Sequence, residues 1–275
     1  MSQLSLQIHQ ELEMPFDLSK EQIDFFRENG YIKLKNVLSP ATIQYMNETI
    51  STEVVKLNTQ HLPIEERDTY GKAFLQIMNI WTRSSPVKEI VCGKRLAKIA
   101  TDLMDVRGVR MYHDQALFKE PGGGHTPWHA DQYYWPLSND NTVTAWIPLQ
   151  ETGLELGPLE FSAKSQQLQE GRTLKISDDS EAVIQKKLTL HDFKKIVEPF
   201  DAGEVSFHGG WVFHRAGANK TDRMRRVMTI IYMDKDMRLK EPANENQQAD
   251  WDTWCPGATI GEVINTPINP ILYEY

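Results

Sequence analysis

The sequence predicts a mainly β protein with flanking helices, whose core is a jelly roll or a related β-barrel. The hydrophobic pattern has a helical period over roughly the first hundred residues, and apolar and polar side chains alternate beyond residue 109. The alternating segments are short, and turns separate them. A chain of 275 residues can bury one sizeable core, so we expect a single domain over residues 1–275.

Helices are expected in the first part of the chain. Ser19 is a suitable N-cap for a helix that ends at Asn29-Gly30, and Ser39-Pro40 opens a second helix with one apolar face. Residues 87–104 continue the helical pattern. The remaining segments have no clear period: a loosely held lead over residues 1–15 and a polar, irregular stretch over residues 57–85.

Short strands make up most of the rest. One strand is expected over Tyr31–Val37, directly after the first helix, because its side chains alternate. The others are expected over residues 109–111, 117–119, 142–149, 204–207 and 226–233. The core therefore spans residues 19–235. Residues 168–198 form a charged insertion, read as a lid or an outer helix, and residues 236–275 form a C-terminal extension.

Composition limits the class of protein and of partner. The formal net charge of -8 argues against nucleic acid and against an anionic membrane as partners, which leaves a small molecule. The two cysteines, Cys92 and Cys255, provide no disulfide framework. The first residues lack a signal-peptide pattern, and no apolar run is long enough for a membrane span. We therefore expect a cytoplasmic protein.

A histidine and an aspartate two residues apart, His129 and Asp131, indicate a metal site. On a strand these two side chains point to the same face, so both can reach one ion. A second histidine would complete a 2-His-1-carboxylate set, which leaves positions open on non-heme Fe(II). The candidates are His208, which precedes a glycine turn, and His214, which ends an apolar run. His214 suits a ligand at a strand end better.

A competing pair of ligands is His125 with His129, four residues apart as in helical zinc sites. Pro127 and the preceding glycines make a helix unfavourable here. His125 is therefore expected at the mouth of the site. The ordinary alternative for the whole His129–Asp131 motif is a surface strand with two solvated side chains.

Two adjacent arginines, Arg225 and Arg226, enter the last alternating strand, so one of them must point inward. A guanidinium inside a barrel is costly unless an anion pairs with it. A dicarboxylic acid that chelates the metal would supply that anion through a two-pronged contact to its far carboxylate. A solvated basic turn is the ordinary alternative.

The chain resembles the phytanoyl-CoA dioxygenase-like Fe(II)/2-oxoglutarate oxygenases, in order from about Ser19 to Met233. The resemblance is carried by five segments: Phe25–Val37, Trp128–Asp131, Ala145–Leu149, Gly157–Glu160 and His214–Thr221 with Arg225. It implies a double-stranded β-helix core, iron held by His129, Asp131 and His214, and 2-oxoglutarate held by Arg225. Lys119 and Trp146 match positions that line the co-substrate pocket in relatives.

The resemblance further implies the reaction: hydroxylation of a C–H bond with O2 as co-substrate and with release of succinate and CO2. The chain has no dense basic patch for a CoA phosphate group, which favours a free small metabolite as substrate. Two other classes remain: a cupin-like metalloenzyme without 2-oxoglutarate, and a non-catalytic metal-binding or sensing module. The candidates for the substrate wall flank the metal motif: His125, Trp128, Tyr133, Tyr134 and Trp135.

Overall fold

The computed structural model describes residues 5–275, apart from the side chains of residues 69 and 70. Eight α-helices are present in this part of the chain, and four of them precede the second strand. They are α1 (Leu6–Glu13), α2 (Lys20–Asn29), α3 (Pro40–Leu57), α4 (Thr69–Ala73), α5 (Ser85–Val91), α6 (Lys94–Met104), α7 (Asp178–Leu190) and α8 (Glu245–Trp254). 

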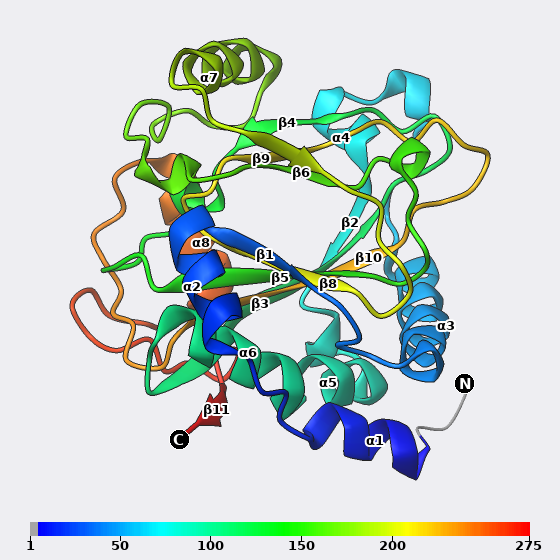
Figure 1. Cartoon of the computed structure of the whole chain (residues 1–275), viewed down its shortest axis with the longest axis vertical. Helices are drawn as coiled ribbons and strands as arrows, with labels where there is room; N and C mark the ends of the chain where they lie inside the picture. Colours follow the sequence, from blue (N-terminus) through cyan, green and yellow to red (C-terminus); the bar gives the residue numbers. More distant parts are fainter. Residues whose placement is uncertain (1–4) are drawn as a thin grey trace.

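Antiparallel strands form the body of the molecule. They are β1 (Tyr31–Leu34), β2 (Leu75–Met78), β3 (Gly108–Phe118), β4 (Thr126–His129), β5 (Thr142–Pro148), β6 (Leu159–Ser162), β7 (Lys195–Val197), β8 (Val205–Gly209), β9 (His214–Ala216), β10 (Val227–Asp234) and β11 (Ile271–Glu274). The larger sheet has the order β1-β8-β5-β10-β3-β11, with β2 also paired to β3, and the smaller sheet has the order β4-β9-β6-β7. The two sheets face each other, which confirms the predicted jelly-roll class (Figure 1).

Side-chain alternation gives the larger sheet two different faces. On β5, Val143, Ala145 and Ile147 belong to the main apolar core, which they share with residues of α3, α5 and α6. The side chains between them, Thr144 and Trp146, point to the opposite face and line a cavity between the sheets. Helices therefore cover one face of the larger sheet, and the smaller sheet covers the other (Figure 1).

The helix ends follow the expected capping chemistry. The Ser19 side chain accepts from the backbone N–H of Gln22, whose own side chain accepts from Ser19, and Gly30 ends α2 with φ 79°. Ser39 caps α3, which has a proline in its first turn. These two predicted helix starts and the end of α2 are confirmed.

Three local expectations were wrong. The lead is helical over α1. Glu11 accepts hydrogen bonds from the backbone N–H and the hydroxyl of Ser39 at 2.8 and 2.7 Å, which docks α1 on the start of α3. Residues 1–4 of the lead lie outside the described part. The stretch over residues 57–85 contains β2, whose pairing to β3 orders a segment of weak pattern. Residues 109–111 and 117–119 belong to one long strand, β3, or directly follow it.

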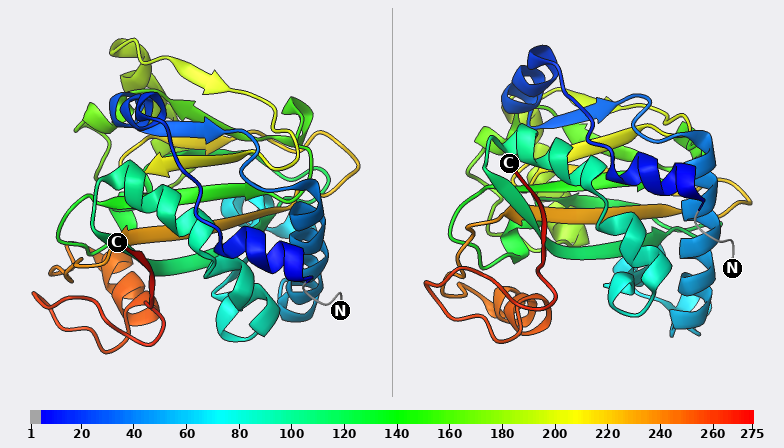
Figure 2. Two further views of the ribbon diagram at one scale, coloured as in Figure 1. Left: turned by 60° about the horizontal axis from the view of Figure 1, so that its bottom comes forward. Right: turned by 90° about the horizontal axis from the view of Figure 1, so that it is seen from below.

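The charged insertion and the C-terminal extension pack against different parts of the sandwich. Within residues 168–198, α7 packs outside the smaller sheet, and β7 adds an edge strand to that sheet. In the C-terminal extension, α8 lies at the end of the sandwich opposite α3 (Figures 1 and 2). Among the helices of residues 5–275, none has the length and apolar character that crossing a bilayer would require.

Candidate metal centre

Two histidines face each other across the β4–β9 pair. His129 and His214 are register partners, and their ring centroids lie 4.2 Å apart. The Nδ1 atom of His129 is 2.7 Å from the carbonyl oxygen of Pro127, and that of His214 is 3.0 Å from the carbonyl oxygen of Val212. A carbonyl oxygen only accepts, so each Nδ1 carries the proton. Both Nε2 atoms therefore face the cavity, where they can serve as metal ligands.

Asp131 completes the cluster from a different kind of element than expected. Strand β4 ends at His129, and Asp131 begins the 3-10 helix η3 (Asp131–Tyr134), so the expected common strand is wrong. The turn still brings Oδ1 of Asp131 to 3.5 Å from Nε2 of His129 and 3.6 Å from Nε2 of His214. One ligand atom from each of the three residues lies within 4.8 Å of the others.

The charges of the cluster fit a divalent metal ion. Burial lowers the pKa of His214 well below its usual range, and the neighbouring imidazoles of His129 and His208 lower it further. Burial alone raises the pKa of Asp131, but the imidazoles of His214, His129 and His208 outweigh it and hold that pKa well below the usual range. Two imidazoles and one carboxylate are the donor set expected for Fe(II).

His208, the alternative second histidine, precedes a turn at Gly210 and Trp211, as the glycines after it suggested. It lies on β8, with Nε2 at 3.4 Å from Oδ2 of Asp131 and its ring 4.3 Å from that of His214. Thr144 donates to the same Oδ2 at 3.1 Å. His208 and Thr144 thus contact the oxygen of Asp131 that faces away from His129 and His214. The sequence signal for this role was the alternation along β8, which places His208 on the cavity face.

An unpaired cation lies deeper in the same cavity. Arg225 is the inward-pointing one of the two arginines; its side chain is 1% exposed, and Nη1 donates to the carbonyl oxygen of Gly157 at 2.6 Å. Its Nε has no partner, and burial lowers the pKa of Arg225 to about 9. Trp146 lies beneath the guanidinium, 5.7 Å from it. Among the described residues no acid pairs with Arg225, so its guanidinium is a buried cation without a counterion.

Lys119 is the antiparallel backbone partner of Arg225, but its side chain does not line the cavity. Its ammonium donates to the carbonyl oxygens of Gly124 and Gly217 at 2.6 and 2.7 Å, so it fastens two loops together. Burial, with a smaller contribution from Arg225, lowers the pKa of Lys119 to about 6. The expectation that Lys119 contacts a bound co-substrate directly does not match this placement.

The depressed pKa of Lys119 predicts a pH-dependent stability. The unfolded chain, with a lysine pKa of about 10.4, binds more protons than the folded chain between pH 6 and 10, so stability rises with pH in this window. Lys119→Met removes that dependence and loses two hydrogen bonds at every pH. Thermal melts measure the Tm of wild type minus the Tm of the variant. We expect this difference to be several degrees larger at pH 9 than at pH 6. A constant difference would contradict the buried, titrating ammonium.

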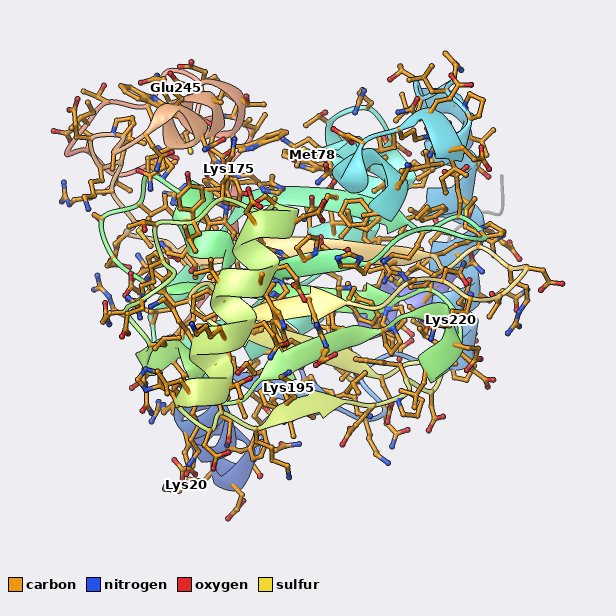
Figure 3. The ribbon with its side chains drawn as sticks, turned by 90° about the horizontal axis from the view of Figure 1, so that it is seen from above. Lys20, Met78, Lys175, Lys195, Lys220 and Glu245 are labelled. Carbon is orange, nitrogen blue, oxygen red and sulfur yellow. The ribbon has the colours of Figure 1, made fainter. Side chains whose placement is uncertain are left out.

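The cavity between the sheets has a volume of about 450 Å³ and contains the triad, His208 and Arg225. Of the predicted substrate-wall residues, Tyr134 and Trp135 line it, and Trp146 lines it beside Arg225. Other parts of the wall come from β2, β3, β6, β9, β10, the segment before α7, and α8. Figure 3 is viewed from the side of α7 and labels Lys175 and Met78, and both of these residues line the cavity.

Three predicted wall residues do not line the cavity. His125 is exposed to solvent. Trp128 is fully buried on the other side of β4, where its indole N–H donates to Gln185 of α7 at 3.1 Å and its ring lies 4.8 Å from the Arg215 guanidinium. Tyr133 points to α8, where its hydroxyl accepts from Asn246 at 3.1 Å. The 3-10 turn of η3 sets the direction of Tyr133, because it rotates successive aromatic side chains to different sides. Trp128 precedes His129 on β4 and therefore points to the opposite face of the strand.

Comparisons with known proteins give a consistent result. The family model described as phytanoyl-CoA dioxygenase (PhyH) matches residues 26–227. The 2-aminoethylphosphonate dioxygenase of uncultured bacterium HF130_AEPn_1 is 23% identical over 219 residues, which cover 78% of this chain and 81% of the relative. The methylphosphonate hydroxylase of Gimesia maris is 22% identical over 218 residues, which cover 78% and 80%.

Among solved structures, the chain is similar to the epimerase SnoN in complex with Fe3+, alpha ketoglutarate and nogalamycin RO. The TM-score is 0.76 at 20% identity, and the match covers 92% of this chain and 98% of that chain. At this identity the likeness establishes the shared jelly-roll fold.

Proposed function

Since the chain belongs to the phytanoyl-CoA dioxygenase family, we propose that the cavity between its sheets is the active site of an Fe(II)- and 2-oxoglutarate-dependent dioxygenase that hydroxylates a small organic molecule. The observation that supports this most is the pairing, in one cavity, of a His-Asp-His cluster with a buried arginine that lacks an anion. A purely structural metal site would close its own coordination shell and would have no use for that arginine.

In this proposal His129, Asp131 and His214 hold the iron. The Nδ1 contacts to Pro127 and Val212 fix both imidazole orientations before any ion binds. Oδ1 of Asp131 faces both Nε2 atoms, while Oδ2 is held by Thr144. The protein thus supplies a preformed three-ligand face and leaves the opposite side open to the cavity.

Arg225 binds the distal carboxylate of 2-oxoglutarate in this proposal. Its guanidinium is already fixed by the Gly157 carbonyl and by the Trp146 ring, so little side-chain freedom is lost when the anion binds. Lys119 positions this end of the cavity from behind by joining two loops. Iron and 2-oxoglutarate, when bound, would activate O2, the oxidant, so that one oxygen atom hydroxylates a C–H bond and the other enters succinate as CO2 is released.

The outer segments enclose this site. Lys175 and Ile176, from the charged insertion, line the cavity, and the N–H of Ile176 donates to the hydroxyl of Tyr134 at 2.9 Å. We propose that residues 168–198 cover the substrate and keep bulk water from the reacting atoms. A small metabolite fits the cavity volume of about 450 Å³.

The test is an anaerobic titration of the Fe(II)-loaded protein with 2-oxoglutarate, monitored by the visible charge-transfer absorption of the chelate. A saturable band establishes the co-substrate, and succinate release then identifies substrates. Bound iron without a band would favour a metalloenzyme that does not use 2-oxoglutarate, and failure to bind iron would favour a non-catalytic module.

The hydrogen bond from Thr144 predicts a measurable effect on the metal. Thr144→Val keeps the shape of the side chain but frees Oδ2 of Asp131, so we expect Fe(II) affinity to fall by about 10–100-fold, measured by anaerobic competition with a chelator. Thr142→Val is the matched control, because Thr142 lies on the same strand and face but donates to Gln132. Equal affinities for the two variants would contradict the role of Thr144.

A further inference from the structure

A second carboxylate lines the cavity, apart from the candidate metal centre. Asp250 lies on α8, in the stretch after residue 227 that the family model leaves unmatched. Among the described residues that line the cavity, Asp250 and Asp131 are the only acids. The imidazoles around Asp131 explain its charge. Asp250 belongs neither to the cluster that would hold iron nor to the charged neighbours of Arg225.

Neutral groups hold Asp250 in place. The hydroxyl of Tyr112 donates to Oδ2 at 3.2 Å, and the side chain of Trp254 also hydrogen-bonds the carboxyl group. No lysine or arginine of residues 5–275 neutralises it. Burial raises the pKa of Asp250 to about 7, in spite of the two hydrogen bonds. A carboxyl group in these surroundings lacks the cation that would offset its desolvation.

The wall next to Asp250 is aromatic. Trp254 is one helical turn further along α8 and also lines the cavity. Trp135 lines it too and contacts the ring of Tyr112 edge-on, with centroids 5.5 Å apart. His113, whose ring lies 4.8 Å from Trp254, stays neutral because burial lowers its pKa to about 4. A neutral imidazole does not repel a positive charge, and aromatic faces beside a carboxylate attract one.

We propose that Asp250, with Trp254 and Trp135, forms a subsite for an organic ammonium group, so that the substrate of this enzyme is an amine. This inference rests on the proposed function for the oxidation itself. The subsite fixes the charged end of the substrate at α8, and the metal triad lies elsewhere on the wall of the same cavity. The Tyr112 hydroxyl orients the carboxylate toward that charged end.

The experiment uses the full chain loaded anaerobically with Fe(II) and 2-oxoglutarate at pH 8. Three probes of similar size are titrated: n-butylammonium, 1-butanol and butyrate. Binding is followed by calorimetry and by tryptophan emission, since Trp254 and Trp135 line the site. We expect the ammonium to bind about tenfold or more tightly than the alcohol and the carboxylate.

Asp250→Asn removes the charge but leaves an oxygen that accepts from Tyr112. We expect this variant to lose about tenfold or more in affinity for n-butylammonium, with 1-butanol binding unchanged. Asp252→Asn is the matched control: Asp252 lies on α8, is exposed and does not line the cavity, so its replacement should leave all three probes unaffected. Wild-type ammonium binding by Asp250→Asn would overturn the proposal and leave Asp250 as an anchor for Tyr112.

A second variant covers the case in which Asp250→Asn does not fold. Trp254→Leu should weaken ammonium binding more than 1-butanol binding, and equal losses would overturn the proposed subsite. The 2-oxoglutarate titration separates the two hypotheses. A normal chelate band without ammonium preference refutes the subsite alone, whereas a missing band refutes the proposed oxygenase whatever the probes do.

Discussion

Arg225→Met should strongly weaken 2-oxoglutarate binding without destabilising the protein. Removal of one member of a buried charge pair costs about 2–5 kcal/mol of binding energy, so the Kd for 2-oxoglutarate should rise by about 30-fold to several thousand-fold. In the absence of ligand, Arg225 is a buried cation without a counterion, and methionine fills a similar volume without that cost. The Tm of the ligand-free variant should therefore equal or exceed that of wild type.

The two effects are measured by anaerobic titration and by thermal melts with and without 2-oxoglutarate. Wild type should gain Tm on adding the ligand, and Arg225→Met should gain none. Arg226→Met is the matched control, because Arg226 is the adjacent arginine on the other face of the strand and does not line the cavity. If Arg225→Met retains the ligand-induced gain in Tm, the assignment of Arg225 is wrong.

Asp131→Ala should have the second large effect, on iron. The variant removes the only carboxylate of the three-residue cluster and leaves His129 and His214 without the charge that balances a divalent ion. We expect iron affinity to fall by more than about 100-fold, beyond the range that outer contacts of a metal ligand provide. The measurement is iron bound per chain after anaerobic loading and desalting.

Asp140→Ala provides the control for Asp131→Ala, since Asp140 is an exposed aspartate in the loop before β5. It should retain full iron occupancy. Circular dichroism of both variants separates loss of metal from loss of fold. Wild-type iron occupancy in Asp131→Ala would refute the assignment of the triad.

Local patterns predicted the fold because they agree with the tertiary structure along most of the chain. Ser19 and Ser39 cap helices through contacts within a few residues, so the signal is in the local sequence. The alternation over β5 and β10 reflects two faces in different environments. It required that either Arg225 or Arg226 point inward, and the family resemblance indicated Arg225. Strand β2 escaped detection because its order comes from pairing with β3, about forty residues away in sequence.

The site was predictable only where residues are close in sequence or carry a family motif. His129 and Asp131 were found by their spacing, although the chain between them turns and does not continue as a strand. Tyr133 was misplaced for this reason, since a 3-10 turn does not follow strand parity. Trp128 was misplaced for a different reason, since it precedes His129 on β4 and points to the opposite face of that strand. No local signal indicated Asp250, because its place in the wall depends on the docking of α8 at the end of the sandwich.

The position of α8 also has a consequence for how such an enzyme diversifies. Candidate ligands for iron and 2-oxoglutarate all lie within residues 26–227, whereas Asp250 and Trp254 belong to the stretch that follows. Two of the three residues of the proposed ammonium subsite are thus encoded after the stretch that encodes the candidate ligands for iron and 2-oxoglutarate, and Trp135 is the one inside that stretch. Exchange of the tail among homologues, by recombination or by design, should redirect the enzyme to new molecules while its oxidising machinery is inherited intact.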